Sequence, residues 1–156
     1  MPNKTSDLED ILNFVPLDGR IGTAGQPSAE QWRAVGEAGY QVVVNLAMPD
    51  SLGFLADEAD LVAAQGMQYI AQPVVWTAPT ARDVEQFFVT MRAHEDEKVF
   101  VHCAMNMRVS AFLYLYRVKV QGASEEEARA AMQRIWTPNE TWQQLIDEVL
   151  RDAPKQ

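Results

Sequence analysis

The chain has 156 residues, of which 47% are hydrophobic and 22% charged, the balance of one globular domain spanning residues 1–156. A net charge of −9 without a block of Lys and Arg excludes a nucleic-acid surface and a basic face for anionic lipid. One cysteine and two histidines exclude an internal disulfide and a zinc site made of these residue types alone, so we expect no metal.

Helical and extended patterns alternate in the first half of the chain. In order, we predict a helix over 7–13 capped by Ser6 and Glu9, a strand over 20–25, a helix from Ser28 to Gly39, a strand over 40–47 and a helix over 54–65. Three consecutive valines in the second strand favour burial on both faces, as in a parallel sheet.

The alternation continues in the second half. We predict a strand over 67–76 that Pro73 interrupts or places at an edge, a helix from Thr80, a strand over 98–103, an almost wholly apolar helix beginning VSAFLYLY, a helix capped by Ser124 and Glu127, and a last helix after Pro138. This order implies an α/β fold whose central sheet has four or five mainly parallel strands, with helices on both faces.

Ligands of such sheets bind beyond the carboxyl ends of the strands, which places the chemistry just after Ala47, Trp76 or His102. Cys103 occupies the last of these places, and Arg108 follows it at the start of the apolar helix. The backbone N–H groups of a tight loop at a helix N-terminus attract an anion, and the same field favours a thiolate. We expect Cys103 to be nucleophilic, Arg108 to grip an oxyanion, and Ser110 to donate a hydrogen bond to the thiolate. The alternative is that Cys103 is a small buried apolar residue and Arg108 a surface charge.

The segment HCAMNMR resembles the signature loop of cysteine-dependent protein tyrosine and dual-specificity phosphatases. The order of RIGTAGQPS, GYQVVVNLAMPD, YIAQPVVW and VFVHC is similar to that of a bacterial branch, which occurs alone or fused to beta-lactamase-like hydrolases. The resemblance covers about residues 15–120 and implies the cysteine-phosphatase fold. It also implies that Cys103 is the nucleophile, that Arg108 clamps phosphate and that His102 orients the loop. The implied phosphate-binding residues are Ala104, Met105, Asn106, Met107, Arg108, Val109 and Ser110.

The loop departs from the phosphatase signature in two ways. Only four residues separate Cys103 from Arg108, one fewer than in that signature; the bacterial branch shares this length, as do many rhodanese-type sulfurtransferases. The loop also contains no glycine. Asn106 is therefore expected to take the left-handed backbone conformation, which Asn tolerates better than Met or Ala.

A phosphatase also needs an acid that protonates the leaving oxygen. In the resembled family this acid is usually an Asp on the loop that leads into the helix before the cysteine strand. In this chain that loop contains residues 77–79, which hold no carboxylate. Asp83 is one candidate, although Thr80 and Asp83 also form a capping pattern. Asp50, in a Pro-Asp turn, is the other. Gln26 and Trp76 are expected near the pocket, each with a simpler role in a turn or in packing.

Three functions are compatible with these residues. The first is hydrolysis of a phosphate monoester, such as phosphotyrosine or a small aryl phosphate, through a phosphocysteine and without a cofactor. The second is sulfur transfer through a Cys103 persulfide, and the third is phosphate binding without turnover. The partner in each case is a phosphorylated substrate or a similar anion, and four Trp residues leave room for a homodimer face. No transmembrane or leader pattern is evident, which predicts a cytoplasmic protein.

Overall fold

A five-stranded sheet lies at the centre of the computed structural model, which describes residues 8–151. The strands are β1 (Val15–Pro16), β2 (Ile21–Ala24), β3 (Val42–Asn45), β4 (Gln68–Ala71) and β5 (Val99–His102). Their spatial order is β1-β2-β5-β3-β4. All neighbours pair in parallel except β1, which runs antiparallel to β2. The α/β fold with a mainly parallel sheet is thereby confirmed.

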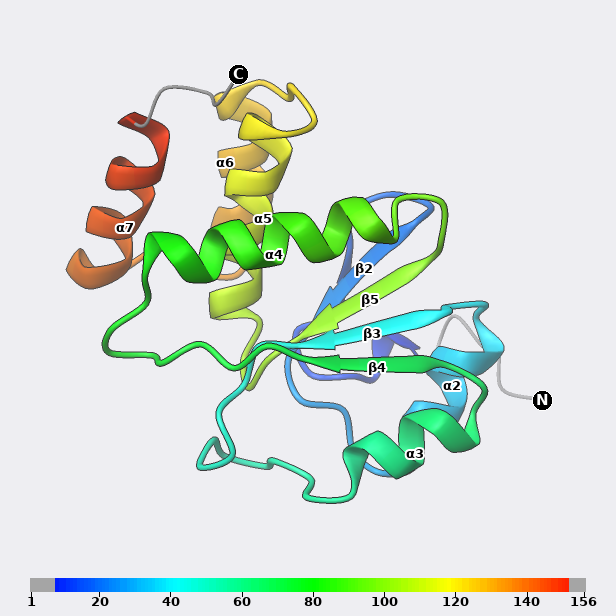
Figure 1. Ribbon diagram of the computed structural model, residues 1–156. Helices are drawn as coiled ribbons and strands as arrows, with labels where there is room; N and C mark the ends of the chain where they lie inside the picture. Colours follow the sequence, from blue (N-terminus) through cyan, green and yellow to red (C-terminus); the bar gives the residue numbers. More distant parts are fainter. Residues whose placement is uncertain (1–7, 152–156) are drawn as a thin grey trace.

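Helices cover both faces of this sheet (Figure 1). They are α2 (Trp32–Glu37), α3 (Glu58–Ala64), α4 (Ala81–Ala93), α5 (Met107–Lys119), α6 (Glu125–Gln133) and α7 (Glu140–Arg151). α2 and α3 pack on one face, and α4 to α7 lie on the other. Each face of the sheet carries its own hydrophobic core. Side chains alternate between the two cores along β3: Val42 and Val44 belong to the larger core and Val43 to the smaller one. Every residue of β3 is buried, as its valines predicted.

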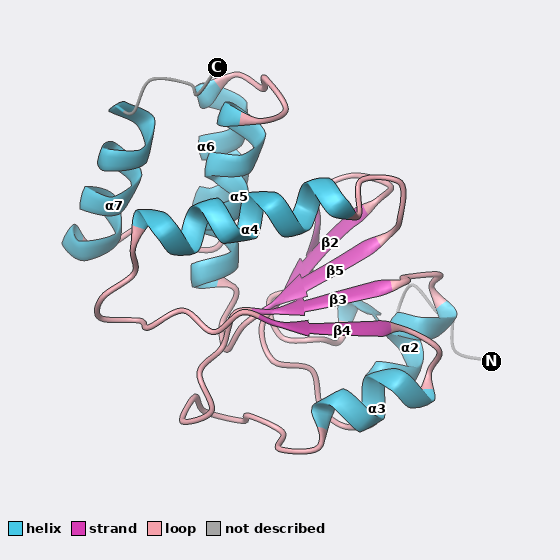
Figure 2. Cartoon of the chain, viewed as in Figure 1, coloured by secondary structure: helices cyan, strands magenta, loops and turns pink. Residues whose placement is uncertain are grey.

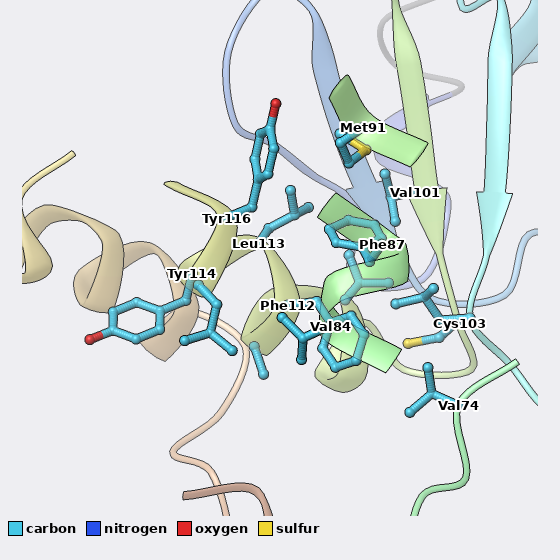
Figure 3. Close-up of a cluster of buried hydrophobic side chains, with 14 of the residues drawn as sticks. Val74, Val84, Phe87, Met91, Val101, Cys103, Phe112, Leu113, Tyr114 and Tyr116 are labelled. Carbon is cyan, nitrogen blue, oxygen red and sulfur yellow. The ribbon is translucent and has the colours of Figure 1, made fainter. Parts of the chain in front are cut away.

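The larger core is built around α5. Eight of its residues are buried, which follows from a sequence that is apolar on every side of the helix. Phe112 meets Phe87 of α4 edge to face, with ring centroids 5.6 Å apart. In Figure 3 the side chain of Cys103 lies at the border of this cluster, close to Val74. The cysteine is therefore placed where the apolar core ends and the loop to α5 begins.

Several element boundaries differ from the predictions. α2 begins at Trp32, because residues 28–31 form a turn in which the N–H of Gln31 donates to the carbonyl of Ser28 (3.1 Å). The Gln31 side chain accepts from the N–H of Ser28 (2.8 Å), which is the one contact of the predicted cap that is present. α3 begins at Glu58 because turns occupy the residues before it. β4 stops at Ala71, before Pro73, and is an edge strand. A helix is expected over 7–13; within its described part, residues 8–9 are helical and residues 10–13 are not, and residue 7 and the predicted cap Ser6 lie outside the described residues.

The loops that follow β3, β4 and β5 leave the sheet along one edge (Figure 2). This is the carboxyl edge, where the parallel strands bring together residues far apart in sequence. The turn after β2 reaches the same place, since the N–H of Gln26 donates to the carbonyl of Ala104 (2.9 Å). Within residues 8–151, none of the helices has the length and apolar character needed to cross a bilayer.

Gly25 allows the turn after β2 to come close to the loop that contains Ala104. A Cβ atom at this position would lie 2.6 Å from the carbonyl oxygen of Ala104 and 3.2 Å from the side chain of Leu12. We expect Gly25→Ala to lower the free energy of unfolding by about 1–3 kcal/mol, because the backbone oxygen cannot move without shifting the loop. Urea denaturation measures this change.

Gly19→Ala is the matched control, since a Cβ atom there meets nothing within 4 Å. Its effect should stay below about 0.5 kcal/mol. Equal effects of the two substitutions would contradict the close approach at Gly25.

Candidate active site

The site is built around the loop between β5 and α5. Cys103 directly follows β5, and its side chain is 1% exposed. Asn106 precedes α5 with φ of 67°, in the left-handed region. The expectation that Asn106 replaces the missing glycine is confirmed. Its buried amide also donates to the carbonyl of Asn13 (2.9 Å) and to the hydroxyl of Thr23 (3.0 Å), which fixes the turn.

Two carbonyl groups of this loop accept hydrogen bonds from residues outside the loop. The N–H of Gln26 donates to Ala104, and the side-chain amide of Asn13 donates to the carbonyl of Met105 (3.0 Å). Within the described part of the chain, the backbone N–H groups of residues 104–108 donate to no protein acceptor. Because they gather at the N-terminus of α5, these donors form a ready site for an anion.

Arg108 lies beside these donors and is itself almost buried, at 6% exposure. Its guanidinium donates to the carbonyl of Val74 (2.9 Å) and to the hydroxyl of Ser51 (3.3 Å), and it lies 5.8 Å from the ring centroid of Trp76. The loops after β3 and β4 thus hold the arginine in place. These contacts occupy two of its five N–H donors, and the others remain for an anion.

A pocket of about 390 Å³ opens next to Arg108. It is lined by Met48, Asp50, Ser51, Leu52, Val75, Trp76, Thr77, Ala104 and Arg108. These residues come from the segments that follow β3, β4 and β5, as the sheet topology requires. Arg108 is the single cation among them, and four of the others carry large apolar side chains.

The two candidate acids have different surroundings. Asp50 is exposed and lines the pocket that contains Arg108. Asp83 forms a complete capping box with Thr80: the Thr80 N–H donates to the carboxylate (3.0 Å), and the Asp83 N–H donates to the Thr80 hydroxyl (3.1 Å). Of the two, Asp50 alone belongs to the pocket lining.

A buried carboxylate that the sequence analysis missed lies behind the loop. Glu58, at the start of α3, is 2% exposed, and its carboxylate lies 2.7 Å from Nε2 of the fully buried His102. It also accepts hydrogen bonds from the amides of Gln26 (2.6 Å) and Asn45 (3.1 Å). Burial by itself would raise the pKa of Glu58, but the hydrogen bond and charge of His102, with help from Gln26 and Tyr69, hold that pKa below its ordinary value.

The signal that could have found Glu58 is its spacing. It precedes the buried Val62 by four residues and therefore lies on the inner face of α3. An acidic residue in the first turn of a helix is normally solvated and stabilised by the helix dipole, which is why the residue type alone does not indicate burial.

The expected roles of Ser110 and Gln26 change in the structure, whereas Trp76 lies at the pocket as expected. The Ser110 hydroxyl donates to the carbonyl of Met107 (2.9 Å) and accepts from Trp136 (3.0 Å), which replaces the expected bond to Cys103. The Gln26 side chain turns to Glu58 and away from the pocket. Trp76 both lines the pocket and packs against Trp136, with ring centroids 5.3 Å apart.

Across residues 8–151, no three His, Cys, Asp or Glu side chains group as metal ligands.

Comparison with known proteins gives consistent matches. Residues 9–148 match the family described as a DSP-PTPase phosphatase fused to NAD+ kinase. The beta-lactamase hydrolase-like protein of Xylella fastidiosa strain Temecula1 is 26% identical over 125 residues, which cover 78% of this chain and 28% of that protein. The chain therefore spans less than a third of the length of this curated relative.

Solved structures share the fold over nearly the whole chain. The DUF442 phosphatase candidate from Shewanella putrefaciens CN-32 superimposes with a TM-score of 0.82 and 34% identity, covering 92% of this chain and 95% of that one. A cysteine-to-serine variant of P. aeruginosa TpbA, crystallised with pTyr, gives a TM-score of 0.66 at 14% identity and covers 97% and 95% of the two chains. At that identity, the likeness to TpbA shows the fold alone.

The left-handed backbone of Asn106 can be tested by comparing two substitutions. Asn106→Ala and Asn106→Gly both remove the hydrogen bonds to Asn13 and Thr23, but only alanine also suffers the steric cost of positive φ. We expect the alanine variant to unfold with a free energy about 1–2 kcal/mol below that of the glycine variant. Equal stabilities in urea denaturation would show that the backbone conformation carries no cost.

The lowered pKa of Glu58 makes its contribution to stability depend on pH. Because the folded-state pKa is below the ordinary 4.5, the stabilisation is complete above that pH and is lost as the pH falls through the folded-state value. We expect Glu58→Gln to lower the free energy of unfolding by about 3 kcal/mol near neutral pH, as for a broken buried ion pair. The difference in free energy of unfolding between this variant and the wild type should become smaller below about pH 4.5, because Glu58 is then increasingly protonated. A difference that does not change with pH in urea denaturation would contradict this.

Proposed function

This chain belongs to the family of DSP-PTPase phosphatases fused to NAD+ kinase, and we propose that it hydrolyses phosphate monoesters with Cys103 as the nucleophile. One observation carries the proposal: the N–H groups of residues 104–108, between Cys103 and Arg108, have no protein acceptor within residues 8–151. A phosphoryl group carries several negatively charged oxygens, which match this set of donors.

The reaction proceeds in two displacements. The Cys103 thiolate attacks phosphorus; the S–P bond forms while the bond from phosphorus to the leaving oxygen breaks, and Asp50 gives its proton to that oxygen. Water then attacks the phosphocysteine, Asp50 takes up the proton of the water, and the P–S bond breaks to release inorganic phosphate and the thiolate. Charge and protons balance over the cycle, and no cofactor takes part.

Arg108 and the loop contribute electrostatic stabilisation. The transferring phosphoryl group spreads charge over its equatorial oxygens, where fixed donors are most effective. Arg108 is already oriented by Val74 and Ser51, and the loop by Asn13 and Gln26. The donors therefore need little rearrangement when the charge develops, which is the condition for a low barrier.

The pocket lining favours an aryl phosphate as substrate. Leu52, Val75 and Trp76 offer apolar contacts to a leaving group, and Arg108 is the one cation to receive phosphate. A second phosphate on the same substrate would find no further cation in this lining. TpbA, which shares the fold, was crystallised with pTyr, an aryl phosphate; for the present chain the substrate class is proposed from the pocket lining.

Hydrolysis of p-nitrophenyl phosphate by purified variants tests the proposal. We expect Cys103→Ser to abolish turnover, because the hydroxyl is a far weaker nucleophile. Arg108→Ala should lower kcat/KM by at least about 100-fold through loss of fixed donors. Asp50→Asn should lower kcat by about 100-fold through loss of the proton donor.

Asp83→Asn is the matched control, since Asp83 caps α4 and does not line the pocket. Its kcat should equal that of the wild type. A large loss of kcat in Asp83→Asn, with full activity in Asp50→Asn, would show that Asp83 and not Asp50 is the acid. Binding of phosphate by the wild type without turnover would instead identify a module that binds anions and does not catalyse.

A further inference from the structure

Behind the Cys103 loop, a carboxylate and an imidazole are enclosed together. Glu58 comes from α3 and His102 from the end of β5, so 44 residues of sequence separate the two. The exposed fractions of their side chains are 2% and 0%, and the distance from Nε2 to the carboxylate oxygen is 2.7 Å. Solvent is excluded from this contact, so the charge state of each group depends on its protein partners.

The hydrogen-bond partners determine where the protons lie. Nδ1 of His102 faces the carbonyl of Cys103 (3.2 Å), which can only accept, so Nδ1 carries a proton. Both oxygens of Glu58 accept from amide N–H groups, one from Gln26 and the other from Asn45. An ionised carboxylate has lone pairs for these donors and for an Nε2–H as well. An imidazolium bound to a carboxylate satisfies all of these partners, and the ionised carboxylate accepts from them more strongly than a neutral carboxyl group would.

We propose that Glu58 is a positioning residue for the nucleophile: its carboxylate keeps His102 as an imidazolium, and this buried cation, adjacent to Cys103 in the chain, favours the Cys103 thiolate. The inference rests on the proposed role of Cys103. It adds a distant residue from α3 to a site that is otherwise built from the segments after β3, β4 and β5. The hydrogen bond from Nδ1 to the Cys103 carbonyl gives the imidazolium a second effect, because it fixes the start of the loop.

The other titratable groups near this pair leave the assignment intact. Tyr69 of β4 hydrogen-bonds with Asn45 and Glu58, and burial together with the Glu58 charge raises the pKa of Tyr69 to about 12, so it remains a neutral donor. The lowered pKa of Glu58 agrees with a carboxylate at neutral pH. On the loop side, Arg108 adds positive charge and the exposed Asp50 lines the open pocket.

The single cysteine of the chain makes a direct test available. Alkylation by iodoacetamide at a series of pH values reports the thiolate fraction of Cys103 alone, without any need for turnover. Glu58→Gln keeps the shape of the side chain but removes its charge, so His102 becomes neutral. We expect the alkylation midpoint to rise by about 1 pH unit, the shift that loss of a nearby opposite charge produces.

The second Glu–His pair provides a matched control. His94 and Glu97 also lie 2.7 Å apart, but at the end of α4, away from Cys103. Glu97→Gln should leave the alkylation midpoint unchanged. His102→Gln should raise the midpoint as Glu58→Gln does, and the double variant should show no further rise, since both substitutions remove the same cation. Additive shifts, or no shift in Glu58→Gln, would overturn the proposal.

The wild-type protein offers a test that does not depend on a variant that folds. The chain has two histidines, so a 15N spectrum of the imidazole rings contains two sets of signals, which His94→Gln assigns. We expect both ring nitrogens of His102 to be protonated at about pH 7.5, above the ordinary range for histidine. A neutral ring would refute the inference even if Cys103 proved to be the catalytic nucleophile. A charged ring without phosphatase activity would instead refute the proposed function.

Discussion

Among the described residues, the backbone N–H groups of the loop after β5 have no protein acceptor, whereas its carbonyl groups are held by hydrogen bonds from neighbouring segments. Unpaired donors at a helix N-terminus are costly unless a ligand or water meets them. The carbonyls of Cys103, Ala104 and Met105 accept hydrogen bonds from His102, Gln26 and Asn13 respectively. With these oxygens fixed outwards, the peptide planes cannot rotate to satisfy the donors internally, and the loop remains open to an anion.

These outer partners come from distant parts of the chain, which couples the loop to the whole fold. Asn13 lies in the segment before β1, and Gln26 lies in the turn after β2. Gln26 contributes twice: its backbone holds the loop, and its side chain reaches Glu58. The loop and the buried Glu58–His102 pair are therefore one connected hydrogen-bond network, and such a network is stable only when most of its members are satisfied.

The apolar core and the polar site meet at Cys103. Its side chain is buried beside Val74 in the larger core, while Arg108 is held by the carbonyl of the same valine. The segment after β4 thus contributes a side chain to the core and an oxygen to the arginine. α5 continues from the loop into the interior, and its tight packing gives the donors at its N-terminus a fixed direction. Rigidity of this kind is what electrostatic catalysis requires.

Local patterns in the sequence determined the order of strands and helices, the capping of α4 by Thr80, the left-handed turn at Asn106 and the position of Cys103 at a strand end. Each depends on residues close together in the chain, so periodicity and turn chemistry suffice to predict it. The partnership of Glu58 with His102, and the separation of Asp50 from Asp83, were decided only by the tertiary structure. They arise because parallel strands bring loops from distant segments to one edge, and no local pattern records which side chains then meet.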